Sequence, residues 1–93
     1  MSKQLPTETE AAIIAALVDQ CEVEHEVDDI EPDWLLFDIG GTKLSSVGLD
    51  SLATLELIVF ISRKYSINME EAPKTAWTTI STLAAYIDGT PPT

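Results

Sequence analysis

Ser51 has the surroundings of a residue that receives a covalent group. It follows Asp50 and precedes a largely apolar stretch that continues to Ile67. Asp50 is a favourable helix N-cap, because its carboxylate can accept hydrogen bonds from free backbone N–H groups of the first turn. We therefore expect Ser51 in that first turn, with its hydroxyl in solvent beside the positive end of the helix dipole. Spare N–H groups there favour a nearby phosphate, so the position suits attachment of a phosphate-linked group.

The residues around Ser51 resemble the attachment motif of acyl carrier proteins. In that family the serine of G-x-D-S-L carries 4′-phosphopantetheine through a phosphodiester. Here residues 48–52 read G-L-D-S-L and residues 55–57 read L-E-L. The resemblance implies that Ser51 is the attachment residue and that a phosphopantetheinyl transferase adds the group from coenzyme A, using Mg²⁺. It also implies that Asp50 helps to position the serine for recognition by the transferase.

The resemblance covers nearly the whole chain. Residues 30–33 with Leu36 and Phe37 resemble the approach loop of the family, and residues 76–87 resemble its last helix. This implies an all-α fold, a four-helix bundle of the acyl-carrier type. The bundle would have three longer helices, one short third helix and a long loop between helices one and two. The chain 1–93 would then be a single carrier domain.

Capping residues and helix breakers predict where these elements begin and end. Thr7 and Glu10 fit a capping box at the start of the first helix. Asp50 begins the second helix, Pro73 limits the third, and Gly89 ends the last. The predicted elements are a helix over 7–22, a loop over 23–49, a helix over 50–65, a short helix over 69–75, a helix over 79–88 and a disordered tail over 89–93.

The second helix is apolar on nearly all sides, so we expect one face in the core and another against partners. Core positions are predicted at Leu57, Ile58, Ile61 and Tyr65. By resemblance, Leu52, Leu55 and Val59 match positions that meet partner enzymes. The full set of predicted partner-binding residues is Leu52, Leu55, Glu56, Val59, Arg63 and Lys64. The residues predicted to line a pocket for the acyl chain are Leu57, Ile61, Trp77 and Ile80.

The charge of this helix departs from the family pattern. Many carriers have a ridge of carboxylates here that docks on lysines and arginines of each partner. This helix instead has Asp50 and Glu56 against Arg63 and Lys64, two charges of each sign. We interpret it as the helix of a carrier that serves dedicated partners. The alternative is that the two basic side chains are solvated and contact nothing.

The loop between the first two helices is acidic and needs apolar anchors to the core. We expect Leu36 and Phe37 to be buried, Trp34 to join the core and His25 to be exposed. Nine carboxylates occur between positions 19 and 38, but they lack the calcium-loop spacing, so no metal site is predicted. Residues 40–46 lack the G-x-x-x-x-G-K pattern of phosphate loops and are interpreted as a flexible lead-in to the serine.

Composition restricts the classes of partner and compartment. Sixteen acidic and five basic residues give a net charge of −11, so nucleic acid and anionic membranes should repel the chain. The single cysteine excludes an internal disulfide and fits a reducing cytosol. No segment approaches the roughly 20 apolar residues that cross a bilayer. We expect a cytoplasmic monomer that neither binds nucleic acid nor inserts stably into membranes.

The sequence predicts an acyl carrier and not an enzyme. It would hold acyl intermediates as thioesters on the arm at Ser51, for acyl-activating and condensing enzymes of a fatty-acid, polyketide or related specialised pathway. Asp50 favours an acyl over a peptidyl or aminoacyl carrier, which share the fold and the serine. A helical interaction module without a prosthetic group is a further alternative. A hydrolase is disfavoured, because the second glycine of the nucleophile elbow is missing and His25 is the one histidine.

Overall fold

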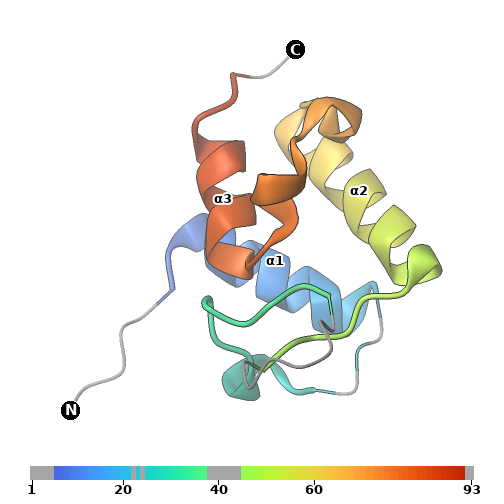
Figure 1. Cartoon of the computed structure of the whole chain (residues 1–93), viewed down its shortest axis with the longest axis vertical. Coiled ribbons are helices and arrows are strands. Elements are labelled where there is room, and N and C mark those ends of the chain that lie inside the picture. The colour runs from blue at the N-terminus through green and yellow to red at the C-terminus, as the bar shows by residue number, and fades with distance from the viewer. Residues whose placement is uncertain (1–5, 22, 24, 38–44, 92–93) are drawn as a thin grey trace.

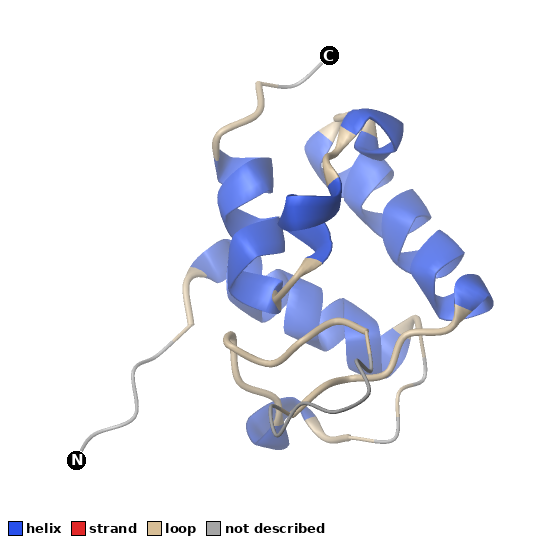
Figure 2. Cartoon of the chain, in the orientation of Figure 1, coloured by secondary structure: helices blue, strands red, loops and turns tan. Residues whose placement is uncertain are grey.

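The computed structural model describes residues 6–21, 23, 25–37 and 45–91. Within them the chain forms three α-helices and three 3₁₀ turns, with a long loop between the first two helices (Figure 1). The helices are α1 (Glu8–Asp19), α2 (Ser51–Tyr65) and α3 (Ile80–Asp88), and the turns are Val27–Asp29, Met69–Glu71 and Lys74–Trp77. Figure 2 shows the described residues as helices and loops without a strand. The predicted all-α class is therefore confirmed.

Side-chain caps begin each of the three α-helices. The Thr7 hydroxyl accepts a hydrogen bond from the Glu10 N–H, and the Glu10 carboxylate accepts one from the Thr7 N–H, which is the predicted capping box. Thr79 caps α3 in the same reciprocal way with Thr82. These local bonds satisfy donors that a helix N-terminus would otherwise leave unpaired. Helix α1 ends at Asp19, short of the predicted span 7–22.

The single short helix predicted over 69–75 is wrong, because two separate 3₁₀ turns take its place. Ala72 between them is extended, with φ −67° and ψ 132°. A residue before proline is driven toward that conformation by a clash with the proline ring, so Pro73 separates the turns. The second turn then runs from Lys74 through Trp77.

The predicted disordered tail over 89–93 is also wrong at its start. The Gly89 N–H donates to the Ala85 carbonyl, and the Thr90 hydroxyl donates to the Tyr86 carbonyl. Residues 89 and 90 therefore continue the hydrogen bonding of α3, and residues 92–93 lie outside the described part of the chain.

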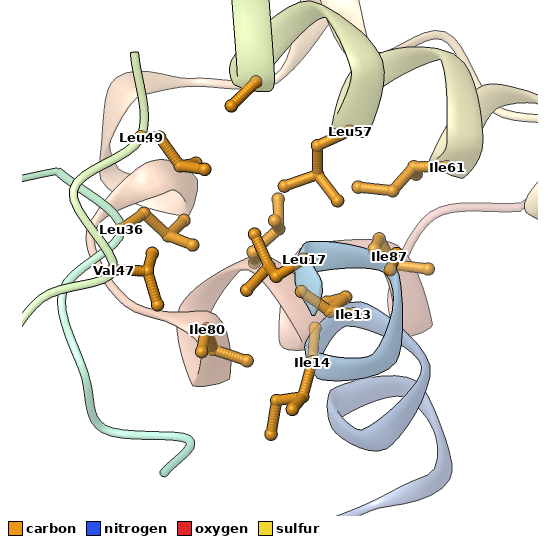
Figure 3. Close-up of a cluster of buried hydrophobic side chains, with 14 of the residues drawn as sticks. Ile13, Ile14, Leu17, Leu36, Val47, Leu49, Leu57, Ile61, Ile80 and Ile87 are labelled. Atoms are coloured by element: carbon orange, nitrogen blue, oxygen red, sulfur yellow. The ribbon is translucent and has the colours of Figure 1, made fainter. Parts of the chain in front are cut away.

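The core is made by all three helices together with the loop. Helix α1 packs against both α2 and α3, and Figure 3 shows Leu57 of α2 pointing toward Leu17 of α1. Of the predicted core positions, Leu57 and Ile61 are fully buried, whereas Ile58 and Tyr65 are half-buried against the cluster. The largest fully buried side chains are Ile13, Leu17, Leu36, Leu57, Ile61, Ile80 and Leu83.

Residues 32–36, here called the central segment, hold the loop to the segment before α2. The Leu35 N–H donates to the Ser45 carbonyl at 2.8 Å, and the Leu35 carbonyl accepts from the Val47 N–H at 2.9 Å. The Leu36 carbonyl accepts from the Leu49 N–H at 2.9 Å. The side chains of Leu36, Val47 and Leu49 point into the core together (Figure 3). The approach to α2 is therefore fixed by both backbone and side-chain contacts.

The central segment is also bonded to the start of α3. The Leu36 N–H donates to the Thr78 carbonyl at 3.1 Å, and the Ser81 N–H donates to the Pro32 carbonyl at 2.8 Å. A further bond joins the Ile80 N–H to the Trp34 carbonyl at 3.3 Å. Buried backbone polar groups need such partners. Two parts of the chain that are distant in sequence are thus joined through one short stretch.

The loop anchors differ in burial from the expectation. Leu36 is fully buried as predicted, but Phe37 and Trp34 are only half-buried. The ring of Phe37 lies against Trp77, with centroids 6.4 Å apart. His25 is half-buried instead of exposed, and its ring packs nearly perpendicular to the ring of Trp34, with centroids 5.0 Å apart. Most of the lead-in predicted over 40–46 lies outside the described residues.

A polar contact joins the start of α1 to the end of α3. Thr9 at the start of α1 is buried, and its hydroxyl donates to the Asp88 carboxylate at the end of α3. The pKa of Tyr65, at the end of α2, is raised mainly by burial. In the described residues no helix is long and apolar enough to cross a membrane.

Substitutions of two leucines test whether the central segment belongs to the core. We expect Leu36→Ala to lower the free energy of unfolding by about 2–5 kcal/mol, because it leaves a cavity in place of a buried side chain. Leu52→Ala removes the same atoms from a side chain that is 66% exposed. Its cost should stay below about 0.5 kcal/mol. Urea unfolding followed by circular dichroism measures both, and equal costs would contradict the assignment of Leu36 to the core.

Candidate functional site

Ser51 is the first residue of α2, and its side chain is exposed. The residue before it, Asp50, has an extended backbone with φ −97° and ψ −176°. Its Oδ1 accepts a hydrogen bond from the Ala53 N–H at 2.7 Å. The predicted cap is confirmed, and it leaves the serine at the start of the first turn.

The first turn of α2 has backbone donors available beside Ser51. The first backbone bond of the helix runs from the Thr54 N–H to the Asp50 carbonyl at 2.9 Å, and the Thr54 hydroxyl donates to the same carbonyl. The N–H groups of Ser51 and Leu52 precede this bond, so the helix itself offers them no acceptor. Such donors and the helix dipole together favour an anion. An anionic group on the Ser51 hydroxyl would therefore lie in a favourable field.

The turn before the serine is anchored on both sides of a glycine. Gly48 has φ +65°, a conformation that side chains disfavour, although an added Cβ would meet nothing within 4 Å. Conformational strain, and not lack of space, is therefore the reason for glycine here. Its neighbours Val47 and Leu49 are buried, and their N–H groups donate to Leu35 and Leu36. Ser51 lies two residues after Leu49, the last residue of this turn.

Cys21 lies close to the first turn of α2. Its Sγ donates to the Ala53 carbonyl at 3.3 Å, and the side chain is half-buried against the core. The pKa of the thiol is raised to about 11, mainly by burial and to a smaller extent by the negative charges of Glu56 and Asp50. Only the thiolate is a good nucleophile. This thiol is therefore held in its unreactive form.

The predicted partner-binding residues share the outer surface of α2. Leu52, Leu55 and Val59 are 66%, 60% and 47% exposed. Arg63 and Lys64 are also exposed in the last turn, and Glu56 is half-buried. An open hollow of about 700 Å³ includes most of this set. Its lining residues are Gln20, Leu55, Glu56, Val59, Phe60, Arg63 and Lys64.

The sequence did not indicate two members of this hollow. Phe60 follows Glu56 by one helical turn, so helical spacing was a signal that could have identified it. Gln20 comes from the C-cap of α1, and no local pattern relates it to α2.

The residues predicted to line an acyl pocket are placed in two settings. Leu57, Ile61 and Ile80 are fully buried within the core. Trp77 packs against that core and also lines a separate hollow of about 420 Å³ with Phe37, Lys74 and Thr78. The pocket stays a prediction, since an acyl chain would enter among the first three residues only if their packing opened.

No group of three or more potential metal-binding side chains is found in the described part of the chain. Comparison with protein-family models, with curated proteins and with solved structures finds no match. Any assignment of function to Ser51 is therefore argued from the motif at 48–52 and from the geometry of α2.

Substitution of Asp50 tests the cap that positions the serine. Asp50→Ala should lower the free energy of unfolding by about 1 kcal/mol, because the Ala53 N–H loses its acceptor. Asp50→Asn keeps an oxygen at the same place and should remain within about 0.5 kcal/mol of the wild type. Urea unfolding compares the three proteins. An alanine variant as stable as the asparagine variant would argue against this hydrogen bond.

The raised pKa of Cys21 predicts a slow thiol. A change from 9.0 to about 11 lowers the thiolate fraction at pH 8 by about a hundredfold. The rate with a disulfide reagent should fall by about tenfold or more, since a more basic thiolate is also a better nucleophile. The colour change of 5,5′-dithiobis(2-nitrobenzoate) measures this rate. The same chain unfolded in urea is the control. A native rate equal to the unfolded rate would show that burial does not protect the sulfur.

Proposed function

We propose that the protein is an acyl carrier and that Ser51 is the attachment residue for 4′-phosphopantetheine. The observation that carries the proposal is an exposed serine at the first position of α2, preceded by its cap Asp50 within the G-L-D-S-L motif. In this proposal the fold is the four-helix bundle of the carrier type. The two 3₁₀ turns between Met69 and Trp77 stand in the place of its short third helix.

The residues at the start of α2 fit a phosphodiester. The Ser51 hydroxyl is accessible to a transferase, and the N–H groups of Ser51 and Leu52 have no acceptor within the helix. The Asp50 carboxylate would oppose a nearby phosphate, but one of its oxygens already accepts from Ala53. Its main role is therefore to fix the first turn. The attached group would supply a thiol on a flexible arm, where an acyl chain is held as a thioester.

Attachment requires little of the chain beyond the serine itself. The Ser51 oxygen would form the new bond to a phosphorus of coenzyme A, and its proton would pass to a base of the transferase. The pyrophosphate linkage of coenzyme A would break, and the adenosine bisphosphate would leave. Catalysis belongs to the transferase, so the carrier is a substrate and not an enzyme.

Tethering explains why such a carrier needs an exposed outer face on α2. A covalent arm replaces free diffusion by a high local concentration at each enzyme visited. Leu52, Leu55 and Val59 lie along the surface that continues from Ser51, and all three are exposed. We propose this face as the contact for acyl-activating and condensing enzymes. We further propose that the protein works as a cytoplasmic monomer.

A helical interaction module without a prosthetic group is the second candidate. The same exposed apolar stripe favours it, because such a stripe serves a binding protein equally well. The two candidates differ in whether Ser51 becomes modified. An aminoacyl or peptidyl cargo would be a variant of the first candidate, distinguished by the mass of the group released from the arm.

Loading in vitro tests the attachment residue. The pure chain with coenzyme A, Mg²⁺ and a broad-specificity phosphopantetheinyl transferase should gain the mass of one phosphopantetheine group. Ser51→Ala should gain nothing, because the acceptor oxygen is absent. Ser45→Ala removes another exposed serine hydroxyl near the motif and should gain as much as the wild type. Intact-protein mass spectrometry measures all three.

The number of fast thiols gives an independent readout of the same reaction. The unloaded chain has one cysteine, whose pKa of about 11 makes it slow. The loaded protein should add one thiol that reacts at the rate of a small free thiol. Failure of the wild type to gain mass, or equal gain by Ser51→Ala, would overturn the proposed function.

A further inference from the structure

The hollow beside α2 joins apolar and basic side chains at one place on the surface. It runs along α2 from Leu55 to Lys64, includes Gln20 at the end of α1, and has a volume of about 700 Å³. Leu55, Val59 and Phe60 supply apolar lining, and Arg63 and Lys64 supply positive charge. Exposed apolar side chains gathered around a hollow mark a contact site more often than scattered ones do.

The charges of the hollow oppose those of the whole chain. Its lining has one carboxylate, Glu56, against the two cations Arg63 and Lys64, whereas the net charge of the protein is −11. The acidic turn Val27–Asp29 lies at the opposite end of the molecule from the end of α2 (Figure 1). Glu70 and Glu71 follow α2 but do not line the hollow. The hollow is therefore a locally basic part of an acidic protein.

We propose that this hollow docks an acidic amphipathic segment of a partner protein. An apolar side chain of that segment enters among Leu55, Val59 and Phe60, and carboxylates that flank it meet Arg63 and Lys64. A helix laid into an apolar groove is a common mode of peptide recognition. The proposal rests on the proposed function, which assigns partner contacts to the outer face of α2, and it adds the chemistry of the partner segment. None of the lining residues belongs to the attachment turn, so docking and attachment can be tested separately.

Electrostatics favours this occupant over the alternatives. Screening limits the effect of distant charges to about 8 Å at physiological salt, so the charges at the contact decide the fit. A basic partner segment would place like charges beside Arg63 and Lys64, which opposes docking. A second copy packed hollow against hollow would place Arg63 and Lys64 beside their own copies, and these like charges disfavour a symmetric dimer at this site.

Two synthetic helical peptides test the preference for acidic flanks. Both carry the same leucine and phenylalanine face, and one is flanked by glutamates while the other is flanked by lysines. Each is titrated into the ¹⁵N-labelled full chain and followed by NMR. The glutamate peptide should shift the amides of the lining residues and should bind there about tenfold more tightly than the lysine peptide. The lysine peptide should instead shift the acidic segment 26–33.

Charge reversals at two basic residues locate the effect. Arg63→Glu should weaken binding of the glutamate peptide by about threefold to tenfold, because one attraction becomes a repulsion. Lys74→Glu changes the charge of the chain equally at an exposed residue outside the hollow. It should leave the binding within about twofold of the wild type. Circular dichroism checks that both variants remain helical.

The proposal would be overturned by shifts from the glutamate peptide away from the hollow, by equal weakening from Arg63→Glu and Lys74→Glu, or by tighter binding of the lysine peptide at the hollow. Shifts of the lining amides with protein concentration alone would assign the hollow to a second copy and would also overturn it. Ser51→Ala separates this proposal from the proposed function. That variant should bind the glutamate peptide as the wild type does. If the wild type gains phosphopantetheine but does not bind the glutamate peptide, the docking proposal is wrong and the proposed function is unaffected.

Discussion

The backbone hydrogen bonds of residues 32–36 are the constraint on which the arrangement around Ser51 depends. The central segment forms backbone hydrogen bonds with residues 45–49, which lead into α2. It forms others with residues 78–81 at the start of α3. Residues 32–36 belong to no helix, so these pairings supply the partners that their buried amides need. Leu36 adds a fully buried side chain at the same place. These contacts hold the N-terminal end of α2 in place against the other helices.

The two faces of α2 have different roles. Leu57 and Ile61 on the inner face are fully buried and join α2 to the rest of the core. Leu52, Leu55 and Val59 on the outer face stay exposed and contribute little to stability in the isolated chain. Exposed apolar side chains in a row are tolerated where another molecule covers them. In the proposed carrier, the inner face of this helix supplies stability and the outer face is offered to partners, with Ser51 at the beginning of the helix.

Local signals were sufficient where one turn of chain contains the whole interaction. The caps at Thr7 and Asp50 each involve a side chain and a backbone group three residues away, so the sequence alone predicts them. The position of Ser51 follows from the second cap. The region after Asn68 was harder to predict, because the conformational restriction before Pro73 divided a helical pattern into two short turns.

Contacts between distant segments could not be predicted in the same way. The ring contact of His25 with Trp34, the bonding of Leu35 to the segment around Ser46, and the joining of Gln20 to the hollow beside α2 each bring together residues from separate elements. No residue type or spacing encodes these pairings, because they arise only when helices and loops pack and bury each other's polar groups. Helices, caps and the exposed serine are local properties of the chain, whereas the fixed approach to the serine and the shape of the hollow beside α2 are properties of the packed fold.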